Sequence, residues 1–284
     1  TVHYKSRRTV ECLNDFPAWA AAAEHPLALF FGSSGVMGGI GTEVVEAHSA
    51  ALGQPVSAAN LGMAKLSNAG TVELIEYVRD VLHDLGKPVA FGVYELELMQ
   101  LSPLPTGREI EVVKAYLSGD YVLEELANVD PWNRWDSACG GTILRGASQT
   151  GQADQAVAAT AQWSKKREQE VTDAYLGRLE FIAAQRQIWL QGARLAESFC
   201  TRLLSFVHPV SAPALDAART RPTGPHLDRL LDSLDGALRC PIMRPEQFDL
   251  NPQDYRDYNH SNRFEGRRKL SEQLTAAVLR QQLR

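Results

Sequence analysis

Pro26-Leu27-Ala28-Leu29-Phe30-Phe31-Gly32-Ser33-Ser34-Gly35 is the stretch of sequence that decides the fold. An uninterrupted apolar run passes directly into a glycine- and serine-rich segment, and a strand without polar alternation is typical of a parallel sheet that helices cover on both faces. We therefore expect a parallel strand over 27–31. We also expect a tight turn after it, which glycines at 32, 35, 38, 39 and 41 permit.

Strand and helix patterns alternate along the rest of the chain, which predicts an α/β fold. The expected architecture is a three-layer α/β/α sandwich with a mostly parallel five-stranded sheet, formed as a single domain over 1–284. Its core comprises 26–103 and 200–284, and 104–199 form a largely helical insertion. The predicted strands are 27–31, 56–60, 89–96, 202–207 and 238–243, and the predicted core helices are 42–52, 70–85, 226–236 and 264–281.

Composition excludes several functional classes. The 284 residues are 44% hydrophobic and 22% charged with a net charge of −5, which is an ordinary globular balance. A basic stripe is absent, so nucleic acid is not an expected partner, and no apolar run is long enough to span a bilayer. Because the chain starts at Thr1 rather than Met, we expect that an N-terminal signal or anchor was removed.

The four cysteines do not form a Cys-x-x-Cys pair, and His25, His48, His83 and His226 have no ligand spacing with acids or cysteines. We therefore predict no metal site and no cofactor. Cys200 and Cys240 lie beside apolar segments, and we expect both to be buried thiols.

Three polar residues match the parts of a serine nucleophile system. Ser34 follows the first strand, and Asp257 and His260 lie three residues apart before the last predicted helix. A serine hydroxyl needs an adjacent base, and an acid orients that base. Since ligands bind at the carboxyl ends of parallel strands, we expect these residues to converge at that edge.

These motifs resemble those of the SGNH/GDSL hydrolase superfamily, which has a flavodoxin-like fold, and in particular its bacterial branch that O-acetylates surface polysaccharides such as alginate. Gly32-Ser33-Ser34 matches the first block, Asn60-Leu61-Gly62 the second, and Asp257-Tyr258-Asn259-His260 the last. The resemblance implies a catalytic triad of Ser34, Asp257 and His260. It also implies that the N–H groups of Ser34 and Gly62 form the oxyanion hole.

One block of the family is missing. The superfamily supplies an asparagine as oxyanion donor after the third strand, whereas Gly92-Val93-Tyr94-Glu95 contains none. Asn60, Asn68 and Tyr94 are the candidate substitutes. We also assign Tyr94 and His208 as candidate substrate contacts, because strand ends line such sites.

The resemblance implies a serine-dependent O-acyl esterase or O-acetyltransferase whose substrates are a carbohydrate or polysaccharide and an acyl donor. It further implies a periplasmic location, with a membrane anchor upstream of Thr1 or partner proteins of a polysaccharide export or acetylation complex.

Two other interpretations stay open. The glycine-rich segment after the first strand resembles the phosphate loop of an NAD(P)-binding Rossmann oxidoreductase, although the second strand ends at Asn60 without an acidic residue for the ribose. A non-catalytic polysaccharide-binding member of the same SGNH fold is the other alternative, which the missing asparagine motivates.

Overall fold

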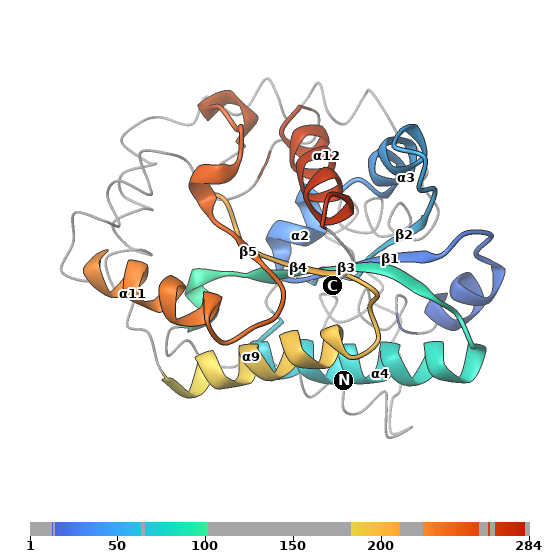
Figure 1. The fold of residues 1–284 in the computed structure, drawn as a ribbon, viewed down its shortest axis with the longest axis horizontal. Helices are drawn as coiled ribbons and strands as arrows, with labels where there is room; N and C mark the ends of the chain where they lie inside the picture. The colour runs from blue at the N-terminus through green and yellow to red at the C-terminus, as the bar shows by residue number, and fades with distance from the viewer. Residues whose placement is uncertain are drawn as a thin grey trace, which may run out of the picture.

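A five-stranded parallel sheet forms the centre of the protein (Figure 1). The computed structural model describes residues 13, 15–63, 66–101, 183–210, 224–255, 261 and 265–281. The strands are β1 (Leu27–Phe31), β2 (Ser57–Asn60), β3 (Val89–Leu96), β4 (Leu203–Val207) and β5 (Ile242–Met243). Their order, β2-β1-β3-β4-β5, is one of the two common orders of doubly wound sheets, and the parallel sheet confirms the α/β class that the alternating sequence pattern predicted.

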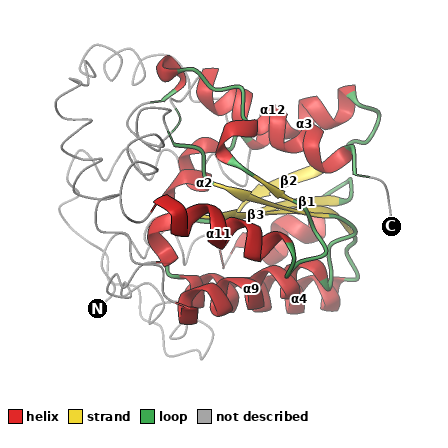
Figure 2. Ribbon diagram, turned by 60° about the vertical axis from the view of Figure 1, so that its left-hand side comes forward, coloured by secondary structure: helices red, strands yellow, loops and turns green. Residues whose placement is uncertain are grey.

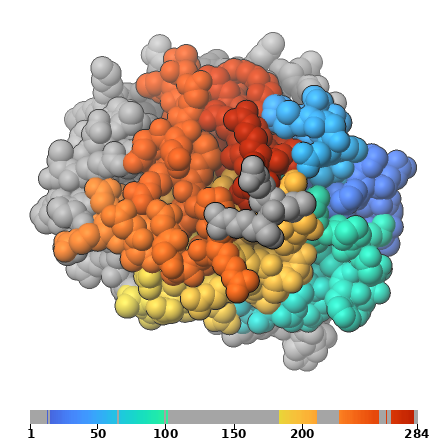
Figure 3. Space-filling model, in the orientation of Figure 1, coloured from blue at the N-terminus to red at the C-terminus, as the bar shows by residue number. Residues whose placement is uncertain are grey.

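Helices cover both faces of the sheet (Figure 2). One face carries α2 (Ser34–Gly39), α3 (Thr42–Ala51) and α12 (Glu265–Leu279), and the other carries α4 (Asn68–Leu85), α9 (Ala183–Glu197) and α11 (Gly224–Asp235). The three-layer α/β/α arrangement is therefore confirmed. In the space-filling view, the blue-to-green segments before residue 101 and the yellow-to-red segments after 183 form one continuous body (Figure 3).

Local sequence explains where the longest helix begins and ends. The hydroxyl of Ser67 accepts the N–H of Gly70 at 3.1 Å and so caps the start of α4. Gly86 ends the helix with φ of 61°, a left-handed conformation that glycine adopts without a Cβ penalty. Between these caps, Leu74, Ile75 and Val78 are buried at helical spacing against the sheet.

The sheet separates two apolar cores. Successive side chains of β3 alternate between them, so Phe91 and Val93 pack under α2 and α12, while Tyr94 and Leu96 pack under α4 and α9. The same alternation places Glu95 on the α2 face, although it is a carboxylate in an otherwise apolar strand.

Most predicted boundaries agree with the structure to within two residues, but two expectations were wrong. The fifth strand is only two residues long, because its predicted start at 238–241 forms a bend without regular structure. The glycine-rich segment forms the short helix α2 rather than a turn. Its glycines do not have positive φ, since within the described chain only Gly53 and Gly86 do.

Of the predicted insertion over 104–199, residues 104–182 lie outside the described residues. Its last part is α9, which packs beside α4. Cys200 and Cys240 are buried free thiols, as expected. No helix in the described segments is long and apolar enough to cross a membrane.

Candidate active site

Ser33 and Ser34 lie where β1 passes into α2, at the carboxyl edge of the sheet. Ser33 is the N-cap of α2, and its hydroxyl accepts the N–H of Gly35 at 3.1 Å. Ser33 is buried, whereas Ser34, the first helical residue, is partly exposed. The geometry therefore gives Ser33 a structural role and leaves Ser34 as the hydroxyl closer to solvent.

A buried acid–imidazole pair lies directly beneath these serines. Glu95 near the end of β3 and His208 just after β4 approach with Oε1 and Nδ1 2.6 Å apart, and both side chains are almost fully buried. The second carboxylate oxygen, Oε2, accepts the backbone N–H of Ser33 at 2.5 Å. Two strands and the β1–α2 junction are thus joined by one carboxylate.

The environment of Glu95 favours its ionised form. Burial by itself would raise the pKa of a carboxyl group, because it penalises the charge. The charge and hydrogen bond of His208, together with the Ser33 N–H, outweigh burial and hold the pKa of Glu95 below its ordinary value. This carboxylate is therefore an anion at neutral pH and acts as an acceptor.

Asn60 at the end of β2 holds the other end of α2. Its Nδ2 donates to the carbonyls of Val36 at 2.9 Å and Ile40 at 3.0 Å, with a longer contact of 3.3 Å to the carbonyl of Met37. Its Oδ1 accepts the N–H of Gly62 at 3.0 Å. The Asn60 amide binds carbonyls in the last turn of α2 and just after it, including that of Val36, which also accepts the N–H of Ile40. It thereby stabilises the helical form of a glycine-rich segment.

The hydrogen bonds of Asn60 affect the donors of the predicted oxyanion hole. The N–H of Gly62 already has an acceptor in Asn60, and a Cβ on Gly62 would collide with the Met37 backbone nitrogen and with Val36. Glycine at 62 is therefore required for close approach to α2. Asn60 donates to backbone carbonyls, and Asn68 donates to Gln100 and Gln185. Neither amide is directed at Ser34 in this structure.

The predicted substrate contacts occupy different places. Tyr94 is buried in the core under α4 and α9, where its ring stacks on Trp189 with a centroid distance of 5.2 Å and an interplanar angle of 6°. Burial, with a smaller contribution from the Glu95 charge, raises its pKa well above the ordinary range. Tyr94 thus packs as a core residue, whereas the His208 ring lies against Gly35, the residue after Ser34.

Asp257 and His260 lie outside the described residues, but both ends of their loop are described. Tyr255 and Ser261 form an isolated antiparallel bridge across the loop 256–260. Ser261 lies against α2, since a Cβ on Gly39 would be 3.0 Å from its hydroxyl, and the Tyr255 hydroxyl donates to the Val210 carbonyl at 3.3 Å. The two described residues that flank 256–260 therefore contact the segment after β4 and α2.

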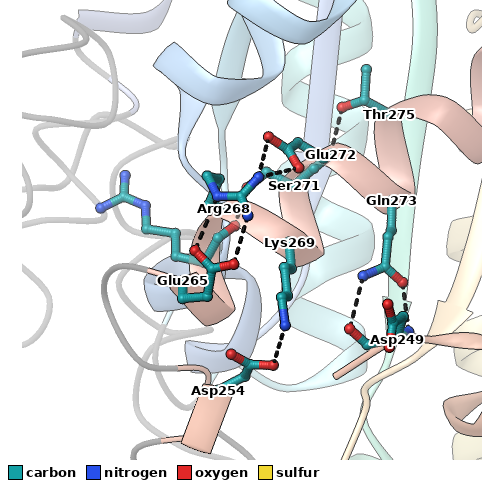
Figure 4. Close-up of polar contacts among 10 residues, drawn as sticks. Asp249, Asp254, Glu265, Arg268, Lys269, Ser271, Glu272, Gln273 and Thr275 are labelled. Atoms are coloured by element: carbon teal, nitrogen blue, oxygen red, sulfur yellow. Dashed lines mark hydrogen bonds and ion pairs between the residues drawn. The ribbon is translucent and has the colours of Figure 1, made fainter. Parts of the chain in front are cut away.

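A buried carboxylate supports this anchor (Figure 4). Asp254 is almost fully buried, and its Oδ2 accepts both the Nζ of Lys269 at 2.9 Å and the N–H of Asn251 at 2.7 Å. Gly266 at the start of α12 abuts the Asp254 backbone so closely that a Cβ could not be accommodated. These contacts attach the base of the loop to α12.

Glu95 is the site residue that the sequence interpretation missed. In the segment Gly92-Val93-Tyr94-Glu95 the sequence pattern assigned a role to Tyr94 but none to the charged residue. A single carboxylate in a strand that is otherwise apolar is itself a signal, because such a group requires buried partners. That signal could have identified Glu95, although not its partner His208.

Among the described residues, no three metal-binding side chains cluster. No protein-family model matches the chain, and no curated protein matches it at a significant level.

Proposed function

We propose that this protein is a serine acyl-transfer enzyme of the SGNH type, either an O-acyl (acetyl) esterase or an O-acetyltransferase. Its substrates would be a carbohydrate or polysaccharide and an acyl donor. In this proposal Ser34 is the nucleophile, His260 the general base and Asp257 the acid that orients it. The strand order, which is that of flavodoxin-like sheets, is compatible with such a fold.

The observation that carries the proposal is the bridge between Tyr255 and Ser261. It closes the loop that contains Asp257 and His260, and Ser261 contacts α2, the helix that begins with Ser34. Gly39 is five positions after Ser34, which is about 7.5 Å along a helix axis. His260 immediately precedes Ser261 in the chain, and the proposal places its imidazole at the Ser34 hydroxyl.

The proposed reaction has two acyl transfers. The hydroxyl oxygen of Ser34 attacks the acyl carbonyl carbon while His260 accepts its proton, and Asp257 stabilises the imidazolium. The tetrahedral intermediate collapses, the leaving alcohol takes the proton from His260, and an acyl ester remains on Ser34. Water or a sugar hydroxyl then attacks this ester, so that hydrolysis and transfer differ only in the second acceptor.

The oxyanion hole of this proposal is small. The backbone N–H of Ser34 is one donor, and the N–H of Gly62 can serve only by leaving its bond with Asn60. Loss of one oxyanion donor typically lowers kcat by about 10²–10³. We therefore expect slow turnover of simple esters, with higher rates when a specific acceptor is bound.

The Glu95 carboxylate argues against the dinucleotide-binding alternative. In a Rossmann protein the pyrophosphate lies against the N–H groups after the first strand. Here the Ser33 N–H is bonded to an anion, and a second anion at the same place would be repelled. A protein that binds NAD(P) would contradict the proposal.

The decisive experiment compares two adjacent serines. Wild type, Ser34→Ala, His260→Ala and the matched control Ser33→Ala would be incubated with p-nitrophenyl acetate, and the intact protein mass recorded. We expect acetylated protein in wild type and Ser33→Ala, none in Ser34→Ala, and slow labelling in His260→Ala. Equal ester cleavage by all four proteins without an adduct would refute the proposal and favour a non-catalytic polysaccharide-binding protein.

A further inference from the structure

A compact buried unit underlies the proposed nucleophile and has no part in the reaction described above. It consists of the Glu95–His208 pair and the backbone of Gly32, Ser33 and Gly35. We propose that the Glu95–His208 pair is a positioning device that fixes the backbone of Ser33 and thereby sets the location of the Ser34 hydroxyl. Its catalytic consequence rests on the proposed function.

The burial of Glu95 requires a specific partner. An unpaired carboxylate in an apolar environment is strongly disfavoured, and buried charges in proteins are paired and hydrogen-bonded. Phe91 and Val93, which precede Glu95 on the same face of β3, are apolar and buried. Both oxygens of Glu95 are engaged, one by His208 Nδ1 and the other by the Ser33 N–H. The carboxylate therefore connects His208 to the β1–α2 junction.

The glycines around the pair show how closely it fits. A Cβ on Gly32 would collide with the Glu95 side chain, and a Cβ on Gly35 would collide with the His208 ring and with Glu95. Neither glycine has positive φ, so both are needed for space and not for backbone conformation. The sequence Gly32-Ser33-Ser34-Gly35 is thus shaped around the pair beneath it.

Ser33 is held on two sides by these contacts. Its N–H donates to the carboxylate of Glu95, and its hydroxyl accepts the N–H of Gly35. A hydrogen bond to an ionised acceptor is about twice as strong as one between neutral groups. Since Ser34 is the next residue, the direction of its side chain is fixed by the backbone that Glu95 holds.

A competing role for the pair is that of catalyst. His208 paired with Glu95 has the arrangement of an oriented base, but its side chain is only 4% exposed and its ring packs against the backbone of Gly35. These contacts favour a support for the backbone. The two roles predict different effects on the Ser33 amide when Glu95 is changed. Loss of a backbone support speeds hydrogen exchange of that amide, whereas loss of a catalytic base does not.

The test uses Glu95→Gln, which keeps the shape and one acceptor oxygen but removes the charge. Ser205→Ala is the matched control, since Ser205 is a buried polar residue on β4 whose hydroxyl contacts Cys240 in the opposite core. Two quantities would be measured: hydrogen exchange of the Ser33 amide, with α4 amides as internal reference, and kcat and KM for p-nitrophenyl acetate.

We expect exchange of the Ser33 amide in Glu95→Gln to rise about 10- to 100-fold more than exchange of the α4 amides, which report the loss of global stability. We expect kcat to fall about 10²-fold with little change in KM, as misplacement of a reacting group does. Ser205→Ala should change neither quantity. Unchanged exchange in Glu95→Gln would overturn the proposal, and so would faster exchange with full kcat.

Two further measurements keep the outcomes distinct. If Glu95→Gln does not fold, the wild-type amide proton of Ser33 is followed by NMR during acid titration. It should shift as Glu95 titrates, and a resonance that does not respond overturns the proposal. If wild type is not acetylated on Ser34, the proposed function fails, while the exchange data still decide whether Glu95 holds the Ser33 backbone.

Discussion

The Oδ1 of Asn60 accepts the backbone N–H of Gly62 at 3.0 Å, while the Nδ2 of the same side chain caps the end of α2. One buried amide therefore joins the end of β2 to the helix that begins with Ser34. Because an amide is both donor and acceptor, no other side chain of this size satisfies both sets of backbone groups.

Replacement of Asn60 should consequently destabilise the protein, and the size of the loss should depend on whether the new side chain is apolar or charged. Asn60→Ala leaves the Gly62 N–H without its acceptor and removes the donor to the carbonyls at the end of α2, which we expect to cost about 1–3 kcal/mol of the free energy of unfolding. Asn60→Asp keeps the acceptor but places a carboxylate against carbonyl oxygens, so it should be less stable than Asn60→Ala at neutral pH. Denaturant unfolding measures both.

The Asp variant also has a distinctive response to pH. Carbonyl oxygens disfavour the ionised form and raise the pKa of the introduced carboxyl group, so the penalty should decrease as pH falls and the group becomes neutral. Asn60→Ala shows no such recovery. A pH-independent deficit in Asn60→Asp would contradict the assigned contacts.

The buried pair beneath Ser33 predicts how stability depends on pH. The pKa of Glu95 is lowered in the folded protein from an ordinary value of 4.5, so its contribution is complete above pH 4.5 and is lost as pH falls through the folded pKa. At neutral pH, the free energy of unfolding of Glu95→Gln should be about 3–5 kcal/mol lower than that of wild type, because His208 loses its buried partner.

Urea unfolding of wild type and Glu95→Gln at neutral pH and again below pH 4.5 would check this expectation. The difference between the two proteins should shrink in acid, because the wild type then loses the ionised carboxylate as well. A difference that is the same at both pH values would show that the charge of Glu95 contributes nothing, and that its shape alone matters.

The sequence was sufficient for the architecture because hydrophobic patterning is a local signal. The apolar runs at 27–31 and 89–96 are strands with those bounds, and the spacing of Leu74, Ile75 and Val78 predicted a buried helix face. The fifth strand was overestimated because the apolar residues of 238–243 pack into the core without pairing along most of their length.

The site was less predictable because its contacts join residues that are distant in the chain. The position of Ser34 after β1 follows from local pattern, and Ser261, which follows the segment that contains Asp257, lies beside α2. Glu95 and His208 meet only in the folded sheet, and the helical state of the glycine-rich segment depends on the Asn60 amide from another strand. Such long-range contacts override local preference.

Asp254 offers a test of the anchor beneath the loop 256–260. Asp254→Ala removes the acceptor for the Asn251 N–H and for Lys269, and we expect a loss of about 1–3 kcal/mol in the free energy of unfolding. Arg268→Gln is the control, because Arg268 lies next to Lys269 on α12. Its partners Glu265 and Glu272 are exposed or partly exposed, and surface ion pairs contribute little to stability (Figure 4).

The two variants should also differ in acylation. If the anchor positions His260, the rate of Ser34 acetylation in Asp254→Ala should fall by more than its unfolded fraction, whereas Arg268→Gln should acetylate like wild type. Equal rates in folded Asp254→Ala and wild type would separate the loop anchor from catalysis and leave Asp254 with a purely structural role.

The packing of α9 on β3 predicts how substitutions change stability in the core under α4 and α9. A methyl group at Gly192 would lie 2.7 Å from the Tyr94 hydroxyl oxygen and 3.1 Å from Cζ, so Gly192→Ala should lose about 1–3 kcal/mol through overpacking, despite the better helix propensity of alanine. Tyr94→Phe removes that oxygen, which has no hydrogen-bond partner among the described residues, and should be neutral or slightly stabilising.

The double variant Gly192→Ala/Tyr94→Phe should therefore be more stable than the sum of the two single changes, because the closest contact disappears. A double-mutant cycle from thermal or urea unfolding measures this coupling. Strict additivity would mean that α9 moves away from β3 instead of pressing on Tyr94. The same Tyr94→Phe protein decides the earlier assignment of Tyr94 as a substrate contact, since a buried core residue leaves KM unchanged and a substrate contact raises it.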